Sequence, residues 1–236
     1  AFDESPDALR VVRLHLLQLL QSVPNRAEDL DAGLPARGLH GEAYRGHIFW
    51  DELFAFPVLN LRSPASTRAL LRYRYRRLPA ARHAAHEAGY AGAMFPWQSG
   101  SDGREESQTL HLNPNSGRWN PDASARAHHI GIAVAHNVWQ YYQATGDLAY
   151  LAENGAEMLA EIARFWVSRA EFDKSRDEGR GRYVIRGVIG PDEFHSGYPD
   201  RPYDGVDNNA YTNVMAVWAI VRALDALDAL PLRDRL

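Results

Sequence analysis

Apolar residues recur at helical spacing from the start of the chain. Leu9, Val12 and Leu16 follow one another at intervals of three and four residues, which places them on one face of a helix. Ser5-Pro6 in front of them is a favourable helix start, because serine caps free backbone N–H groups and proline fits the first helical position. The pattern predicts a helix that runs to about Ser22.

A second serine-proline pair, Ser63-Pro64, predicts another helix that continues to about Gly89. Arg68, Arg72 and Arg76 share one of its faces. Because the chain is acidic overall, we interpret this basic stripe as a solvated face rather than a phosphate or nucleic-acid contact.

The second half of the chain predicts a helical hairpin. Ile130, Val134 and Val138 trace one apolar face, after which Gly146 is a typical helix terminator and Asp147 a typical cap for the next helix.

That next helix carries Leu159 and Ile162 on its apolar side and three glutamates at a spacing of four, which we interpret as a second solvated face: Glu153, Glu157 and Glu161. A last helix is expected after Asp207-Asn208-Asn209 and before Pro231. Its core-facing residues are predicted to be Val214, Trp218, Val221 and Leu224.

Two segments depart from the helical pattern. The β-branched run from Tyr183 to Ile189 is typical of a buried strand. Residues 92–122 are rich in Gly, Ser, Asn and Pro, but their large apolar side chains argue against disorder, so we predict a long ordered loop. The fold class is therefore all-α, with helices in stacked antiparallel hairpins, long loops and no exact internal repeat.

Composition restricts the class of protein. With 236 residues, of which 45% are hydrophobic and 24% charged, the chain fits one globular domain. No apolar run is long enough for a membrane span, and a net charge of −4 offers no basic field for nucleic acid. The absence of cysteine excludes disulfides and thiolate metal sites and fits a cytoplasmic protein. The chain begins at Ala1 without an initiator methionine, so we expect it to be a piece of a longer one.

One stretch combines groups that could carry chemistry: Val188 to His195, which contains Gly190-Pro191, a turn-forming pair, and Glu193. A carboxylic acid beside apolar surface keeps its proton more easily, so Glu193 is a candidate proton donor to a sugar. The alternative is an ordinary Pro-Asp turn at the surface.

A second candidate site lies between Tyr44 and Phe54, where aromatic residues surround Arg45, His47 and Asp51. Aromatic rings pack on the C–H faces of sugars while charged groups bind the hydroxyls, so this mixture is typical of a sugar site. The alternative is that Phe49, Trp50 and Phe54 are core residues.

Ten histidines also raise the possibility of a metal site. His129 and His136 would share a helical face next to His128, but no further ligand joins them at a spacing of three or four. We therefore expect no metal.

Several motifs together resemble glycoside hydrolase family 65, which includes maltose, trehalose and kojibiose phosphorylases and some hydrolases of α-glucosides. The motifs are residues 41–51 (GEAYRGHIFWD), 95–97 (FPW), 138–147 (VWQYYQATGD), 163–166 (ARFW), 190–195 (GPDEFH) and 206–213 (VDNNAYTN). The resemblance implies an (α/α)6 toroid, of which residues 1–236 would form the first half of the catalytic domain.

The resemblance also implies roles for single residues. Glu193 matches the general acid, Trp50 with Asp51 matches residues that hold the reacting glucose, and Arg45, His47 and Trp97 resemble neighbours of the same subsite. Reaction with inversion needs an acid together with phosphate or an activated water as nucleophile. The implied partners are an α-glucosidic disaccharide, with phosphate as co-substrate of a phosphorylase and no other cofactor. A homodimer is one candidate assembly.

The sequence departs from the family at two places. Gln98 stands where relatives commonly carry glutamate after Phe-Pro-Trp, and residues 196–203 differ as well. These changes leave the disaccharide open, and they leave open a homologue that binds sugar without cleaving it. A non-catalytic sugar-binding or structural module is therefore the alternative function.

Overall fold

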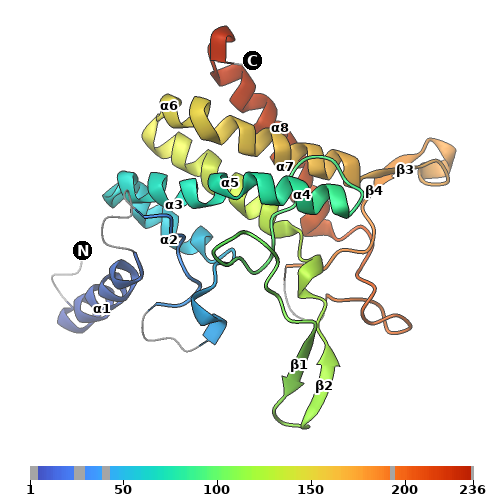
Figure 1. Ribbon diagram of the computed structural model, residues 1–236, viewed down its shortest axis with the longest axis horizontal. Helices are drawn as coiled ribbons and strands as arrows, with labels where there is room; N and C mark the ends of the chain where they lie inside the picture. Colours follow the sequence, from blue (N-terminus) through green and yellow to red (C-terminus); the bar gives the residue numbers. More distant parts are fainter. Residues whose placement is uncertain (1–4, 24–29, 39–42, 192–194, 235–236) are drawn as a thin grey trace.

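The computed structural model describes residues 5–23, 30–38, 43–191 and 195–234, which form a layer of packed helices with two small hairpins attached (Figure 1). The helices are α1 (Pro6–Ser22), α2 (Glu52–Arg62), α3 (Pro64–Arg76), α4 (Leu78–Glu87), α5 (His129–Thr145), α6 (Leu148–Tyr150), α7 (Ala156–Arg169) and α8 (Ala210–Ala229). A π-helical turn, η4 (Leu151–Gly155), joins α6 to α7. Short 3-10 turns are η2 (Ala43–Gly46), η3 (Ser124–Arg126), η5 (Asp177–Gly179) and η6 (Leu232–Asp234).

The centre of the helical layer is α5, which contacts α2, α3, α7 and α8. Most of its side chains are buried, among them Ile130, Ile132 and Val138. A helix that is apolar on every side requires neighbours on every side, which explains its central place. Its predicted end is confirmed: Gly146 is left-handed with φ 66°, and the Asp147 side chain accepts from the Tyr150 N–H.

The contact between α7 and α8 corrects the predicted core face of the last helix. The buried side chains of α8 are small: Thr212, Ala216, Ala219, Ala223 and Ala226. Val214, Val221 and Leu224 are exposed, and only Trp218 of the predicted set packs against the core. Small side chains allow two helices to approach closely, so the alanine stripe forms the contact and the larger residues lie outside it.

The helix predicted over residues 63–89 is two helices, α3 and α4, with a break at Arg77, whose φ and ψ are −99° and 5°. Pro79 stands near the start of α4. A proline ring clashes with the carbonyl four residues earlier in a continuous helix, so the chain turns here and Pro79 begins a new one.

Members of both charged stripes form ion pairs. Arg68 contacts Asp147 and Glu153, whereas Arg76 contacts Asp31. Glu153 is exposed as predicted, but the solvated interpretation is wrong for Glu161, whose side chain is only 8% exposed and pairs with Arg82 and Arg164. Burial of Glu161 is tolerated because its negative charge is compensated on both sides.

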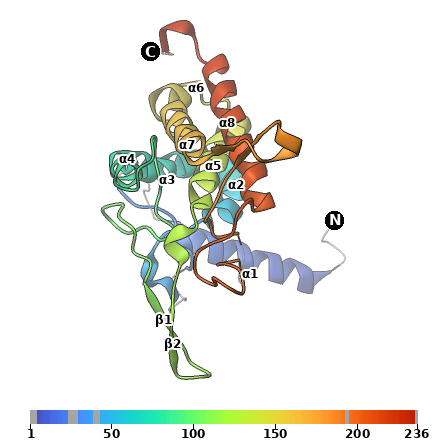
Figure 2. The same cartoon turned by 90° about the vertical axis from the view of Figure 1, so that its right-hand side faces the viewer.

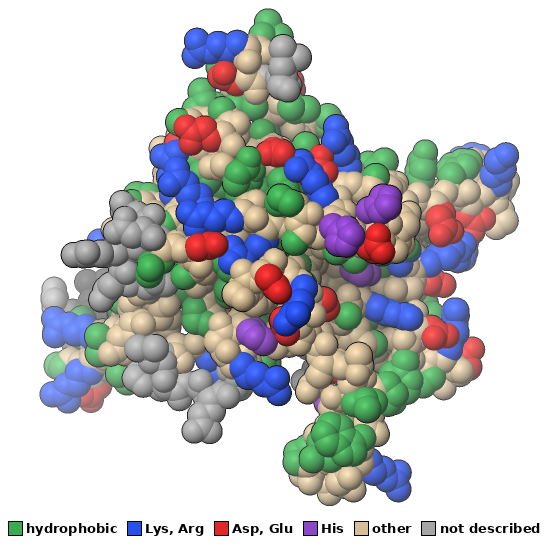
Figure 3. All heavy atoms as spheres, viewed as in Figure 1, with side chains coloured by type: hydrophobic (Ala, Val, Ile, Leu, Met, Phe, Trp, Pro, Cys, Tyr) green, Lys and Arg blue, Asp and Glu red, His purple; other side chains and the backbone are tan. Residues whose placement is uncertain are grey.

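The predicted long loop contains a hairpin that projects from the helical layer (Figures 1 and 2). Its strands are β1 (Leu110–Asn113) and β2 (Arg118–Pro121), which pair antiparallel. Exposed apolar side chains, including Leu112 and Trp119, gather on it at the bottom of Figure 3. The turn that joins the strands needs Gly117, which has φ 65°.

The second hairpin pairs β3 (Glu171–Asp173) with β4 (Arg182–Val184). The strand predicted to Ile189 therefore ends at Val184, and Tyr183 is exposed rather than buried. Ile185 and Val188 are buried as expected, because the chain enters the helical layer at this point. In the described part of the chain, no helix is both long and apolar enough to span a membrane.

Candidate active site

A cleft of about 980 Å³ opens where α2 and α5 begin and the β1–β2 hairpin leaves the helical layer. One side is aromatic: Tyr44, Trp50, Trp97 and His129. The other side is polar: His111, Asn113, Asn120, Asp122 and Ser124. A site that offers rings on one wall and hydrogen-bonding groups on the other can hold a molecule with apolar faces and many hydroxyls.

The aromatic side is a cluster of rings in contact with one another. The ring centroid of Trp97 lies 5.8 Å from that of Trp50 and 4.9 Å from that of His129. Trp50 and His129 are 5.0 Å apart, and Phe49 contacts Trp97 edge-on at 5.7 Å. Rings at these distances support one another's orientation, so the cluster presents a defined surface to the cleft.

Trp50 and Asp51 are held in place by a buried arginine. Arg74 of α3 donates to the carbonyl of Phe49 at 2.9 Å and to the carboxylate of Glu52 at 3.0 and 3.1 Å. Because Phe49 and Glu52 stand directly before and after the pair Trp50-Asp51, one guanidinium ties both ends of this segment to α3. The core alternative holds for Phe49, which is buried, but not for Phe54, which is 75% exposed.

Asp51 precedes α2 and is half-buried. Burial raises the pKa of its carboxyl, and its own backbone N–H offsets part of that rise. Its side chain makes no capping hydrogen bond to the helix. Asp51 does not line the cleft itself, so the structure brings it next to Trp50 without turning it into the cavity.

Arg45 and His47 also lie beside the cleft rather than on its lining. Arg45 is exposed and has φ 54°, in the short turn η2. Nδ1 of His47 lies 2.6 Å from the side-chain amide of Gln98, the residue after Trp97. Of the five sugar-binding residues predicted, Trp50 and Trp97 therefore form the cleft, while Arg45, His47 and Asp51 support its edge.

His129 is a cleft residue that sequence reasoning considered only as a metal ligand. It is 2% exposed, and neither ring nitrogen has a hydrogen-bond partner. Burial lowers its pKa to about 4, an effect that the nearby Ile189 backbone partly offsets, so the ring is neutral at neutral pH. A neutral imidazole has one donor and one acceptor, and the His129 ring that carries them borders the cleft.

The polar wall was missed because residues 110–121 were interpreted as loop. The signal was present in the alternation Leu-His-Leu-Asn, followed by the turn Pro-Asn-Ser-Gly. His111 pairs with Asn120 across the hairpin, on the face opposite Leu112 and Trp119. The polar face of the hairpin therefore lines the cleft, together with Pro121 at the end of β2.

The stretch from Val188 to His195 borders the cleft through Ile189, Gly190, Pro191 and His195. A Cβ on Gly190 would lie 2.5 Å from Nδ1 of His195, so only glycine fits this close turn. Glu193 lies outside the described residues, as do the residues on either side of it.

The three histidines of the metal alternative do not converge. The ring of His128 contacts Phe165, whereas that of His136 contacts Trp218. Within the described residues, no group of three or more potential metal ligands is present.

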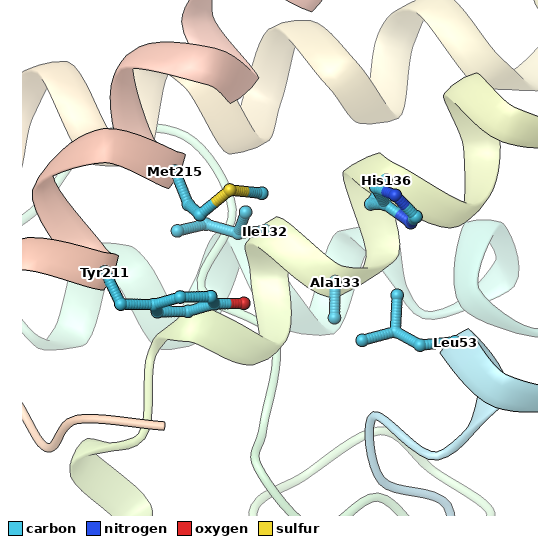
Figure 4. A pocket seen from close by; sticks show the side chains of 6 residues that line it. All are labelled: Leu53, Ile132, Ala133, His136, Tyr211 and Met215. Carbon is cyan, nitrogen blue, oxygen red and sulfur yellow. The ribbon is translucent and has the colours of Figure 1, made fainter. Parts of the chain in front are cut away.

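His136 instead borders a smaller, apolar pocket of about 180 Å³ between α2, α5 and α8, with Leu53 and Met215 (Figure 4). Tyr211 lines this pocket and also contacts His129, with the two ring centroids 6.1 Å apart.

Comparison with known proteins agrees with the motifs. The sequence profile of the glycosyl hydrolase family 65 central catalytic domain matches residues 13–236. A glycosyl hydrolase of uncharacterised activity from Mycobacterium tuberculosis is 69% identical over 97% of this chain and 17% of its own length. Trehalose 6-phosphate phosphorylase from Lactococcus lactis is 44% identical over 91% of this chain and 27% of its own length.

Kojibiose phosphorylase from Thermoanaerobacter brockii is 40% identical over 97% of this chain and 28% of its own length. A solved structure from the human microbiome, with a provisional description as a kojibiose phosphorylase, superposes with a TM-score of 0.73 at 27% identity. It covers 92% of this chain and 27% of its own. The chain therefore spans less than a third of the length of each of these relatives.

Proposed function

Because this chain belongs to glycosyl hydrolase family 65, we propose that the protein cleaves an α-glucosidic disaccharide with inversion at the anomeric carbon. The glucose unit at the reacting bond would lie in the cleft against Trp50 and Trp97. The observation that carries the proposal is the joining of these two rings, from segments about 50 residues apart, with His129 in one cluster beside a polar wall.

Each wall would have its own task. The indole faces of Trp50 and Trp97 would pack on the C–H face of the sugar, and the neutral ring of His129 would bind a hydroxyl that it can reach without a charge penalty. Asp51, which lies beside Trp50 at the edge of the cleft and carries a raised pKa, would accept from a further hydroxyl after its side chain rotates towards the sugar.

Glu193 would be the general acid. It would give its proton to the glycosidic oxygen as the bond to the anomeric carbon breaks, while that carbon is attacked from the opposite face by phosphate, or by water whose proton a general base accepts. Attack by phosphate yields glucose 1-phosphate, and attack by water yields glucose. Support comes from the nearest described residues. Pro191, two positions before Glu193, and His195, two positions after it, both line the cleft.

We further propose that residues 1–236 form the first half of an (α/α)6 toroid. The support is the apolar surface left outside the helical layer, including Phe54, Val214 and Leu224, each more than half exposed. Further helices packed on α2 and α8 would cover these side chains. Electron density for the full-length protein would decide this, and solvent-exposed α8 in that structure would contradict it.

The function is tested on the full-length protein with trehalose, trehalose 6-phosphate, maltose and kojibiose, each with and without phosphate. We expect release of glucose 1-phosphate or of glucose from at least one of them. Glu193→Gln should abolish turnover of these unactivated substrates and leave sugar binding largely intact. Glu87→Gln, at an exposed position on α4, is the matched control.

Two results would contradict the proposal. If the unchanged protein turned over none of the four sugars, the proposed activity would be wrong. Near-full turnover by Glu193→Gln would show that Glu193 is not the general acid. Light scattering on the same preparation would test the predicted homodimer.

A further inference from the structure

We propose that Glu105 is a positioning residue of the sugar site, because its carboxylate holds the backbone from which the ring of Trp97 enters the cleft. This inference rests on the proposed function for its effect on sugar binding. The geometry that carries it does not depend on the reaction.

The contacts of Glu105 converge on one short segment. Oε2 accepts from the backbone N–H of Trp97 at 2.7 Å, and Oε1 accepts from the N–H of Gln98 at 3.1 Å and from that of Ser107 at 3.0 Å. A carboxylate with three backbone donors makes hydrogen bonds that are shorter and stronger than those between neutral groups. The side chain therefore fixes the backbone of Trp97 and Gln98 through hydrogen bonds to both N–H groups.

The other side of the segment is fixed by backbone pairing. Ser99 exchanges hydrogen bonds with Ile48 at 2.9 and 3.0 Å. On the side of Glu105, the N–H of Glu106 also donates to the carbonyl of Gln98 at 2.9 Å. Ile48 is followed directly by Phe49 and Trp50. The segment that carries Trp97 is thus held between Glu105 on one side and the segment that carries Trp50 on the other.

The consequence for the site is the relative placement of the two indole rings. Their centroids are 5.8 Å apart with an angle of 53° between the planes, and Trp97 also contacts His129 at 4.9 Å. Rotation of the Trp97 backbone by a small angle would move the ring against both neighbours. Loss of the Glu105 hydrogen bonds would therefore alter the surface on which the sugar packs.

Two features separate this role from a contribution to the core. Glu105 is exposed, so its replacement leaves no cavity. The next residue, Glu106, has the same chemistry, but its side chain binds Arg104 instead, at 2.7 Å. Glu105→Gln and Glu106→Gln are therefore a matched pair in which only the first disturbs Trp97.

The test compares both variants of the full-length protein. Glu105→Gln replaces one acceptor oxygen by an NH2 group, which faces a backbone donor in either orientation. We expect KM for the disaccharide to rise about tenfold, with kcat within about threefold, whereas Glu106→Gln should stay within about twofold in both. Glu105→Asp, whose shorter arm keeps the charge, should lie between the two.

A second readout does not require activity. Labelling the full-length protein with 5-fluorotryptophan gives each tryptophan its own fluorine NMR resonance, and Trp97→Phe identifies the one from Trp97. Glu105→Gln should shift or broaden that resonance, and Glu106→Gln should leave it in place. An unshifted Trp97 resonance in Glu105→Gln, or equal rises of KM in the two variants, would overturn the inference. If the unchanged protein binds no sugar, the proposed function fails and the fluorine spectrum alone decides the role of Glu105.

Discussion

The side-chain amide of Gln98 lies 2.6 Å from Nδ1 of His47 and joins the segment that carries Trp97 to the one that carries Trp50. Both side chains are half-buried, so the bond is partly shielded from water. Gln98 thus forms part of the contact between the two segments. An amide can bind either tautomer of a neutral imidazole, because it offers both a donor and an acceptor.

This bond predicts the effect of Gln98→Met, which keeps the length of the side chain and removes its polar groups. The free energy of unfolding should fall by about 0.5–1.5 kcal/mol, the usual net value of one hydrogen bond. Sugar affinity should fall about three- to tenfold because the two segments are less firmly joined. Urea unfolding and calorimetric titration measure the two effects. Gln108→Met, at an exposed position of the same loop, is the control, and equal losses in both variants would contradict a specific role for Gln98.

The buried pair of Arg74 and Glu52 predicts a large and asymmetric effect on stability. Both side chains are 1% exposed, and burial raises the pKa of Glu52 even beside Arg74. Arg74→Met should lower the free energy of unfolding by about 3–5 kcal/mol, because it leaves an uncompensated buried carboxylate. Adding Glu52→Leu should restore more than half of that loss.

The control for the buried pair is Arg76→Met. Arg76 pairs with Asp31 at the surface, where an ion pair is worth about 1 kcal/mol or less. Denaturation with urea measures these three variants and the unchanged protein. If the double variant were as unstable as Arg74→Met alone, the stability of this segment would not come from compensation of charge.

His128 and His129 predict how stability depends on pH. Burial lowers the pKa of His128 to about 3 and that of His129 to about 4, whereas both have pKa values near 6.5 when unfolded. The unfolded chain therefore takes up protons first as the pH falls. The stability that the neutral rings contribute is complete above pH about 6.5 and is lost as the pH falls towards about 4.

Between pH 7 and pH 5 the loss should be about 2 kcal/mol for each of the two rings. Urea unfolding at several pH values measures it. His129→Phe keeps the ring in the cluster and should remove about half of this dependence. A variant with the same pH dependence as the unchanged protein would show that His129 has the same pKa in the folded and the unfolded chain.

A substitution at Asp51 should affect sugar affinity without lowering the stability of the fold. Since burial raises the pKa of this carboxyl, its charged form is unfavourable in the fold, and that cost appears as the pH rises through the folded pKa. Asp51→Asn removes the charge and should leave stability unchanged or slightly higher at pH 7. Sugar affinity should fall by about tenfold or more, as for a lost charged hydrogen bond. Thermal unfolding and calorimetric titration test this, and equal losses of both would favour a purely structural role.

Local signals in the chain were sufficient for most element ends. Ser5, Gly146, Asp147 and Asn209 begin or end helices where expected, because capping depends on a few neighbouring residues. Trp50 and Trp97 were also predicted to belong to one site, since both stand within motifs that resemble the family.

What the sequence by itself determined is where several helices begin or end, which family the chain resembles and that Trp50 and Trp97 belong to one candidate site. Only the tertiary structure decided that α8 packs through alanines, that Glu161 is buried between arginines, and that a hairpin supplies the polar wall. The physical reason is the sequence separation of the interacting residues. Caps and turns depend on residues a few positions apart, whereas the packed face of a helix, the partner of a charge and the neighbours of Trp97 depend on segments that meet only after folding.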